Sequence, residues 1–324
     1  MKPKTILLDK ATIGNDIDLK EITKQCNLIS YDYTKKEKTS ERIKDAEIII
    51  TNKVVISTKE FEAASKLKLI CVAATGYNNI NIQEAKKRNI IVANVKGYSS
   101  ESVAQTVFGY ILTIMNSIPE VAKDIKVGLW QKSQTFTMLN HPFLELSGKN
   151  LGIIGYGTIG KRVAQIAEVF GMNILICKSL KRENLKTPPK QENILRVTFN
   201  DILRKSDIIS IHTPLTAETE NLISEKELLT MKKSSILINT ARGGIVNEND
   251  LYNALNNNDI NFAAMDVLTT EPPTNGNILF NAPNIIITPH TAWTSFESRK
   301  RLVSGIAENI SFFKKGRKDF DLCK

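Results

Sequence analysis

Proton transfer near neutral pH has few candidate side chains in this sequence, since its 324 residues include three histidines. His141 precedes a proline in a polar stretch, His212 stands in Ile-His-Thr-Pro, and His290 stands in Thr-Pro-His-Thr-Ala-Trp. Histidine is the most frequent general acid or base in enzymes, but a histidine taken at random is more often structural. Context must therefore select among the three, and we interpret His141 as structural.

A second chemical signature is the glycine pattern Gly155-Tyr-Gly-Thr-Ile-Gly160, which follows an apolar run and opens a helical pattern. Between a strand and a helix, Gly155 permits a tight turn, Gly157 lets the backbone approach a pyrophosphate, and Gly160 lets the helix pack on the strand. The N-terminus of that helix adds unpaired N–H groups and the positive end of its dipole. The pattern predicts dinucleotide binding, and its alternative is a turn that only joins two elements.

The residue expected to contact the cofactor's ribose departs from the usual NAD pattern. Lys178 stands at the end of the next predicted strand, where an Asp or Glu commonly binds the ribose 2′-hydroxyl. Ser179, Lys181 and Arg182 follow it. A cation beside a hydroxyl suits the 2′-phosphate of NADP, and the alternative is a solvated turn with NAD held by its other contacts. The sequence therefore leaves NAD and NADP both open as cofactors.

Short apolar runs alternate with amphipathic helical patterns, which is typical of parallel sheets covered by helices on both faces. A first series of strands is predicted at residues 5–8, 28–31, 47–51, 69–73 and 89–92. A second series is predicted at residues 150–155, 173–177, 207–211, 235–239, 262–267 and 284–288. Two α/β units in succession are therefore expected.

Two helical segments connect or follow these series. A long helix is predicted from Ser100 to Asn116, with Ser99 or Ser100 as its cap and Pro119 after its end. Residues 128–140 then form a polar stretch between the two series. Helical character returns at 295–315 without a further strand, so we expect this segment to pack on the first unit.

The composition indicates a globular protein, with 42% hydrophobic and 24% charged residues and no run of the roughly 20 apolar residues that a membrane helix needs. The net charge is +10, but the lysines are dispersed among acidic residues, which indicates a solvated surface rather than nucleic-acid binding. The four cysteines are widely separated, and the N-terminal apolar run is too short for a signal peptide. We expect a cytoplasmic protein without a bound metal and with neither nucleic acid nor membrane as a partner.

Segments spread over nearly the whole chain carry a resemblance to a known family. They are Ala73-Ala-Thr-Gly-Tyr-Asn-Asn-Ile80, Glu101-Ser-Val-Ala-Gln-Thr106, Gly155 to Gly160, His212-Thr-Pro-Leu215, Asn239-Thr-Ala-Arg-Gly-Gly244, Asp266-Val267, Glu271-Pro-Pro273 and Pro289-His-Thr-Ala-Trp293. In this order they resemble the D-isomer-specific 2-hydroxyacid dehydrogenases. The resemblance implies an α/β fold of two doubly wound parallel-sheet domains. A flavodoxin-like substrate-binding domain would span 1–98 and 295–324, and an inserted Rossmann NAD(P)-binding domain would span 99–294.

The same resemblance implies a role for particular residues. Arg242 corresponds to the arginine whose planar fork binds the carboxylate and carbonyl of a 2-oxo acid. His290 corresponds to the general acid of the reduction, and Glu271 to the carboxylate that orients the imidazole and favours its charged form. The cofactor's surroundings would comprise Thr106, Gly155, Gly157, Thr158, Ile159, Gly160, Lys178, His212, Thr213, Pro214, Thr240, Ala241, Arg242, Asp266 and His290. The substrate would contact Asn52, Thr75, Gly76 and Arg242, with Lys53 nearby.

Within the family, residues 50–55, 70–76, 97–103 and 141–146 are most similar to glycerate dehydrogenase, also called hydroxypyruvate reductase. The resemblance thus implies reversible reduction of hydroxypyruvate to D-glycerate, with glyoxylate as a second substrate. It also implies a homodimer in which the helix from Ser100 to Asn116 lies at the contact. Dehydrogenases of D-lactate, 3-phosphoglycerate or phosphite remain alternatives, as does a nicotinamide-sensing binding protein, whereas Glu271 argues against formate dehydrogenases, which have glutamine there.

Overall fold

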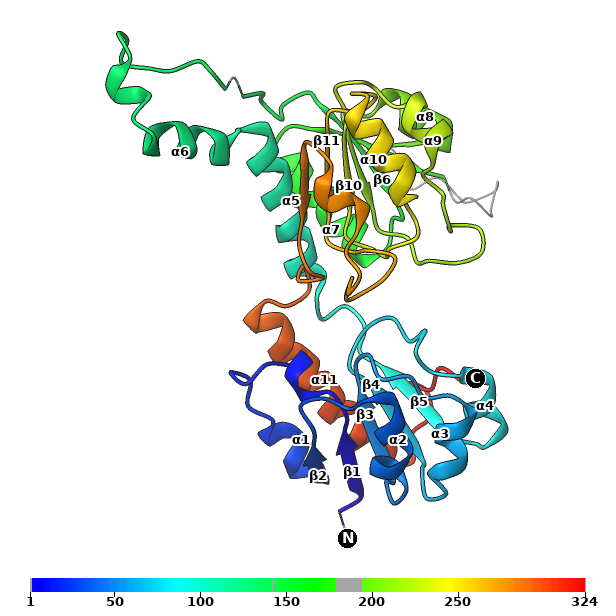
Figure 1. The fold of residues 1–324 in the computed structure, drawn as a ribbon. Coiled ribbons are helices and arrows are strands. Elements are labelled where there is room, and N and C mark those ends of the chain that lie inside the picture. Colours follow the sequence, from blue (N-terminus) through cyan, green and yellow to red (C-terminus); the bar gives the residue numbers. More distant parts are fainter. Residues whose placement is uncertain (1, 142, 179–193, 324) are drawn as a thin grey trace. The chain divides into compact units, whose positions relative to one another are not determined.

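The computed structural model describes residues 2–141, 143–178 and 194–323, which form two compact units (Figure 1). Unit 1 comprises Met1–Ser99 and Thr294–Lys324, and unit 2 comprises Ser100–Trp293. Each unit has one sheet, and every strand pair in both sheets is parallel. The predicted fold class, two parallel-sheet α/β domains, is confirmed.

Unit 1 has a five-stranded sheet in the order β2-β1-β3-β4-β5, which is the flavodoxin-like arrangement. Its strands are β1 (Lys4–Leu7), β2 (Asn27–Ser30), β3 (Ile48–Thr51), β4 (Leu69–Val72) and β5 (Ile91–Asn94). Its helices are η1 (Lys10–Thr12), α1 (Lys20–Gln25), α2 (Lys36–Ile43), α3 (Thr58–Ala63), α4 (Ile82–Lys87) and α11 (Phe296–Lys314). The chain thus leaves this unit after β5 and returns to it for α11.

Helices cover both faces of this sheet, which is why its central strands are almost entirely apolar. All four residues of β3 and of β4 are buried. Ile43, Phe61 and Ala85 bring α2, α3 and α4 into one core with the alternate side chains of the strands. The long helix α11 packs against α1 and β4.

Unit 2 has a seven-stranded sheet in the order β12-β11-β10-β9-β6-β7-β8. Its strands are β6 (Asn150–Ile154), β7 (Asn173–Cys177), β8 (Ile194–Val197), β9 (Ile208–Ile211), β10 (Ile236–Asn239), β11 (Phe262–Met265) and β12 (Ile285–Ile287). Its helices are α5 (Ser100–Met115), α6 (Ile118–Lys126), η2 (Trp130–Lys132), α7 (Thr158–Val169), α8 (Phe199–Lys205), α9 (Glu225–Thr230), α10 (Glu248–Asn256) and η3 (Ile278–Asn281). The strand order reverses between β6 and β9, where parallel sheets of this kind bind ligands.

Two cores hold unit 2 together, one on each face of its sheet. Phe108 and Ile111 of α5 pack with Val163 and Ala167 of α7 and one set of strand side chains. The side chains that point the other way pack with Ile202 of α8, and with residues of α9 and α10. Such burial on both faces fixes the ends of the strands, where the candidate site residues lie.

Every strand that the sequence predicts is present, with ends displaced by up to two residues. The edge strand β8 was not predicted, because Arg196 interrupts its apolar pattern and Leu195 is exposed. The helix α6 was not predicted either: Pro119 follows α5, but it also occupies the first turn of this further helix. Among the described residues, none of the helices has the length and apolar character needed to span a bilayer.

Candidate functional site

The candidate residues of unit 2 follow the carboxyl ends of adjacent strands. Gly155 follows β6, Lys178 follows β7 and His212 follows β9. Thr240 follows β10, and the segments after β11 and β12 carry Asp266 and His290 in the same way. Carboxyl ends of parallel strands meet at one edge of a sheet, so residues distant in the sequence are brought together there.

The glycine loop between β6 and α7 has the geometry of a phosphate-binding turn. Gly155 has a φ of +98°, and a Cβ there would lie 2.5 Å from the carbonyl carbon of His212. A Cβ on Gly160 would lie 2.2 Å from the Gly155 oxygen, whereas a Cβ on Gly157 would have no described atom within 4 Å. Gly157 is the N-cap of α7, and no described side chain caps this helix end. The first and third glycines are therefore required for packing, and the second leaves open space at the positive end of the helix dipole.

Two buried polar atoms just after β9 and β10, on the same strand-end edge as this loop, lack a hydrogen-bond partner among the described residues. They are Nδ1 of His212 and Oγ1 of Thr240. The other ring nitrogen of His212, Nε2, lies 2.9 Å from Oγ of Ser210. Buried polar atoms are nearly always satisfied, so a bound group is the natural partner of these two. Together with the open face at Gly157, they fit a dinucleotide cofactor.

Burial lowers the pKa of His212 to about 4. The imidazole is therefore neutral at pH 7, which fits the prediction that His212 belongs to the cofactor pocket and is not the acid.

The pKa of His212 makes stability depend on pH in a defined direction. Between pH 4 and 6.5 the unfolded chain binds a proton at this position and the folded chain does not, so the free energy of unfolding falls as the pH is lowered through this window. We expect lowering the pH from 7 to 4.5 to cost about 2 to 3 kcal/mol through this residue. Urea unfolding of the wild type and His212→Asn at both pH values measures the effect, and an equal pH dependence in the two proteins would contradict it.

Lys178 lies where the sequence predicts the ribose contact. Its backbone N–H donates to the Val197 oxygen at 2.9 Å, which fixes the end of β7 against β8, and its side chain is exposed. Ser179, Lys181 and Arg182, which were considered together with it, lie outside the described residues.

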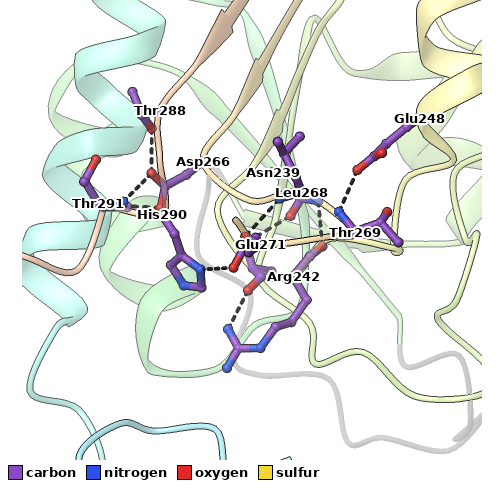
Figure 2. A network of polar contacts seen from close by, with 12 residues as sticks. Asn239, Arg242, Glu248, Asp266, Leu268, Thr269, Glu271, Thr288, His290 and Thr291 are labelled. Carbon is purple, nitrogen blue, oxygen red and sulfur yellow. Dashed lines mark hydrogen bonds and ion pairs between the residues drawn. The ribbon is translucent and has the colours of Figure 1, made fainter. Parts of the chain in front are cut away.

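His290 and Glu271 form a hydrogen-bonded pair (Figure 2). Nδ1 of His290 donates to Oε2 of Glu271 at 2.6 Å, and the two side chains are 21% and 30% exposed. The other carboxylate oxygen of Glu271 accepts from the Leu268 N–H at 3.0 Å. His290 itself has a φ of +56°, and its N–H donates to the Asp266 carbonyl oxygen at 2.8 Å. With Nδ1 bound to the carboxylate, Nε2 is left for a reacting atom.

Asp266 organises the backbone around His290. It is 1% exposed, and its Oδ1 accepts from Oγ1 of Thr288 at 2.5 Å and from the Thr291 N–H at 2.8 Å, while its Oδ2 accepts from the Ala292 N–H at 3.0 Å. Burial raises the pKa of this carboxyl group in spite of these bonds. The Tyr110 hydroxyl of α5 completes the network through Thr288.

Arg242 lies on the turn after β10, in the same close view (Figure 2). The Asn239 side chain shapes this turn, since its Nδ2 donates to the Arg242 oxygen at 2.8 Å and its Oδ1 accepts from the Ala241 N–H at 3.0 Å. The Arg242 guanidinium donates to the Ala241 oxygen at 2.6 Å, and it has no ion pair with any described carboxylate. A Cβ on Gly243 would lie 2.0 Å from the Leu268 carbonyl carbon, so only glycine lets this turn meet the loop that leads to Glu271.

The remaining predicted residues of unit 2 make only local contacts. Thr106 on α5 donates through Oγ1 to the Ser102 oxygen at 3.0 Å. Thr158 and Ile159 form the first turn of α7, and Thr213 and Pro214 follow His212. Nε2 of His141 lies 2.9 Å from Oδ2 of Asp124 on α6, which is consistent with a structural histidine.

The predicted substrate contacts lie in unit 1, at the carboxyl ends of β3 and β4. Asn52 is 4% exposed, and the Thr75 Oγ1 donates to the Val95 oxygen at 3.1 Å, with Gly76 beside it. The loop after β3 depends on Asp9, which is not among the residues predicted from the sequence. The buried Asp9 carboxylate accepts from the backbone N–H groups of Asn52 at 2.9 Å and Lys53 at 2.7 Å. Its place just after β1 was the available signal.

Comparison with known proteins gives a consistent result. Residues 108–292 match the family model described as "D-isomer specific 2-hydroxyacid dehydrogenase, NAD binding domain". The chain is 37% identical over 320 residues to a glycerate dehydrogenase of Methylorubrum extorquens, covering 98% of each chain, and 36% identical over 317 residues to a hydroxypyruvate reductase of Blautia hydrogenotrophica, covering 97% of each.

Among solved structures, a D-lactate dehydrogenase of Aquifex aeolicus complexed with NAD and lactic acid superposes with a TM-score of 0.81 at 28% identity, covering 97% of this chain and 96% of that one. Similarity of this extent spans both units of the chain. The chain therefore belongs to the D-isomer specific 2-hydroxyacid dehydrogenase family of NAD(P)-dependent oxidoreductases.

Proposed function

We propose that this protein reduces hydroxypyruvate to D-glycerate reversibly, with glyoxylate as a second substrate. The observation that carries the proposal is the His290–Glu271 pair at 2.6 Å, on the same strand-end edge as the glycine loop and the Arg242 turn. An acid held by a carboxylate, a cation with a planar fork and a dinucleotide cradle are the groups that reduction of a 2-oxo acid requires.

Each residue has a defined part in this reaction. When bound, the nicotinamide supplies the hydride that reduces the carbonyl carbon. The Arg242 guanidinium forms no ion pair with any carboxylate of the described residues. It therefore binds the substrate carboxylate and carbonyl oxygen. His290 donates a proton from Nε2 to the carbonyl oxygen, and Glu271 stabilises the charged imidazolium before that transfer. In the oxidation of D-glycerate, His290 takes the hydroxyl proton instead.

The substrate specificity rests on the relatives. The two curated proteins described above are named for glycerate and hydroxypyruvate, and both align over nearly the full chain. D-Lactate and 3-phosphoglycerate are the alternatives on the same catalytic residues. A nicotinamide-sensing binding protein is a further alternative, and it would bind cofactor with negligible turnover.

The deciding experiment follows the loss of reduced-cofactor absorbance with hydroxypyruvate, glyoxylate, pyruvate and 3-phosphohydroxypyruvate, each with NADH and NADPH. The highest kcat/KM is expected with hydroxypyruvate. A higher kcat/KM with pyruvate would instead indicate a D-lactate dehydrogenase. A higher value with 3-phosphohydroxypyruvate would indicate a 3-phosphoglycerate dehydrogenase. Cofactor binding without turnover of any acid would favour the sensor.

Lys178 is proposed to favour NADP by facing the 2′-phosphate. Its position at the end of β7 and its exposed side chain support this role. Lys178→Asp should shift the ratio of kcat/KM for NADPH and NADH towards NADH by at least about tenfold, since one charge-assisted hydrogen bond is lost and a repulsive carboxylate is gained. Lys205→Asp, on α8, is the control for a change of charge alone. An unchanged ratio in Lys178→Asp would exclude contact with the phosphate.

Unit 1 is proposed as the substrate-binding domain. Asn52, Thr75 and Gly76 lie on the loops after β3 and β4, at the end of the sheet where α/β domains bind ligands. Asp9 accepts from the N–H groups of Asn52 and Lys53. The donors that suit a carboxylate are therefore the Asn52 side-chain amide and the backbone N–H groups of Thr75 and Gly76. The unit containing residues 100–293 is the proposed cofactor domain.

A homodimer is proposed as the assembly. The large apolar side chains of α5, such as Val107 and Ile111, are buried inside unit 2. Exposed ones gather instead on α6 and the segment after it, where Trp130 is 52% and Phe136 is 91% exposed. An apolar surface of this kind is typical of an interaction site. Light scattering should give about twice the 36.2 kDa of the chain, and a monomeric mass would contradict the proposal.

A further inference from the structure

The loop from Leu268 to Glu271 connects two parts of the candidate site. At one end its backbone lies against the Arg242 turn, because a Cβ on Gly243 would lie 2.0 Å from the Leu268 carbonyl carbon. At the other end Glu271 is oriented by the Leu268 N–H at 3.0 Å and bonds to His290. A displacement of this loop would therefore move the partner of the acid.

Glu248 holds this loop from outside the site (Figure 2). This residue begins α10, and its Oε1 accepts from the Thr269 N–H at 2.6 Å. Its Oε2 accepts from Nδ2 of Asn277 at 2.8 Å, and Asn277 in turn caps η3 by accepting from the Leu279 N–H at 2.9 Å. One carboxylate thus ties both ends of the segment from Thr269 to Asn277 to a helix.

A helix-capping role does not explain Glu248. The N-cap of α10 is Asn247, whose Oδ1 accepts from the N–H groups of Asn249 and Asp250, each at 3.1 Å. The end of α10 is therefore capped without the Glu248 side chain, which points across to the loop instead. No sequence motif named above includes this residue.

We propose that Glu248 is a positioning residue for the reduction: by fixing the loop at Thr269 and Asn277, it keeps Glu271 against His290. The inference rests on the proposed function. The carboxylate is required because both partners are donors. In Glu248→Gln the side-chain NH2 group would face one of these two N–H donors. That hydrogen bond is lost, and that end of the loop is released.

The first test needs no substrate. Hydrogen–deuterium exchange of the wild type and Glu248→Gln is compared in peptides that contain Leu268 and Thr269, and faster exchange is expected in the variant. Asp250→Asn is the matched control: it removes the same charge from the same helix, but its carboxylate accepts from the Glu225 N–H at 3.0 Å and not from the loop. Equal exchange of the loop in wild type and Glu248→Gln would overturn the proposal.

The second test asks whether Glu248 acts through Glu271. Glu248→Gln should lower kcat for hydroxypyruvate by about 10- to 100-fold, with the Kd for reduced cofactor unchanged, since misplacement of a catalytic group is costly. In a Glu271→Gln background the same substitution should have almost no further effect, whereas a role in stability alone would give the same loss in both backgrounds. Equal losses, or an unchanged kcat, would overturn the proposal.

The two tests separate the inference from the function on which it rests. A wild-type chain that turns over none of the four acids contradicts the proposed function. The exchange comparison still decides in that case whether Glu248 holds the loop.

Discussion

Replacing His290 with alanine is expected to lower kcat for hydroxypyruvate reduction by about 10²- to 10⁴-fold, the range that general acid catalysis supplies. Glu271 holds Nδ1 of this ring, and no other described histidine lies on the same loop. His212 cannot replace it at pH 7, because burial keeps its pKa at about 4. Steady-state rates at pH 7 with saturating cofactor measure the effect.

A second variant is needed because the backbone of His290 has a positive φ, which alanine tolerates poorly. This φ of +56° is a conformation that asparagine tolerates better than alanine, and asparagine cannot transfer a proton at pH 7. His290→Asn should therefore show the same loss with a thermal unfolding midpoint near the wild-type value. His141→Gln, which removes a histidine paired with Asp124, should keep most of the activity. More than a tenth of the wild-type kcat in both His290 variants would show that another group is the acid.

Arg242→Ala is expected to lower kcat/KM for hydroxypyruvate by about 10²- to 10⁴-fold. The guanidinium would make two charge-assisted hydrogen bonds to the substrate, each contributing about 1.5 to 3 kcal/mol. Arg242→Lys keeps the charge but loses the planar fork, so its loss should be smaller, about 10- to 100-fold. The turn itself should survive both changes, because Asn239 fixes it through the Arg242 backbone oxygen.

Two measurements complete the arginine experiment. The Kd for reduced cofactor separates substrate binding from damage to the cofactor site, and it should change by less than about threefold if the side chain acts on the substrate. Arg204→Lys, an exposed arginine on α8, is the matched control. A kcat/KM for Arg242→Ala within threefold of the wild type would exclude Arg242 from substrate contact.

The candidate site was predictable wherever residue type and strand position coincide. His212 and His290 follow apolar strands, and the glycine loop lies between a strand and a helix, so each is visible in the sequence. Glu248 was not predictable, and Asp9 could be suspected only from its place just after β1, because each carboxylate accepts hydrogen bonds from backbone N–H groups. A backbone N–H carries no signature of residue type, so such partners emerge only when the fold brings them together.

The limits of fold prediction have a similar cause. The central strands β3, β4 and β9 are buried on both faces and are almost entirely apolar, with Thr51 in β3 and Ser210 in β9 as their polar residues. The edge strand β8 pairs with β7 alone in the described sheet and exposes Leu195, so its pattern is weak. The helix α6 does carry apolar residues at helical spacing, Ile118, Val121 and Ile125, but none of its residues is buried, and Pro119 in its first turn is also a signal that a preceding helix has ended.

The division of unit 1 into two sequence segments affects the order in which the protein folds during synthesis. Unit 2 is one continuous segment, so all of it has been translated when the ribosome reaches residue 293. Unit 1 begins first, but α11, which packs on α1 and β4, is translated last. At 5 to 20 residues per second, the nascent N-terminal segment waits about 10 to 40 s after Ser99 for the chain to reach residue 294. During that interval the face of its sheet that α11 will cover is exposed to chaperones, and the proposed cofactor domain is the first part of the enzyme able to fold completely.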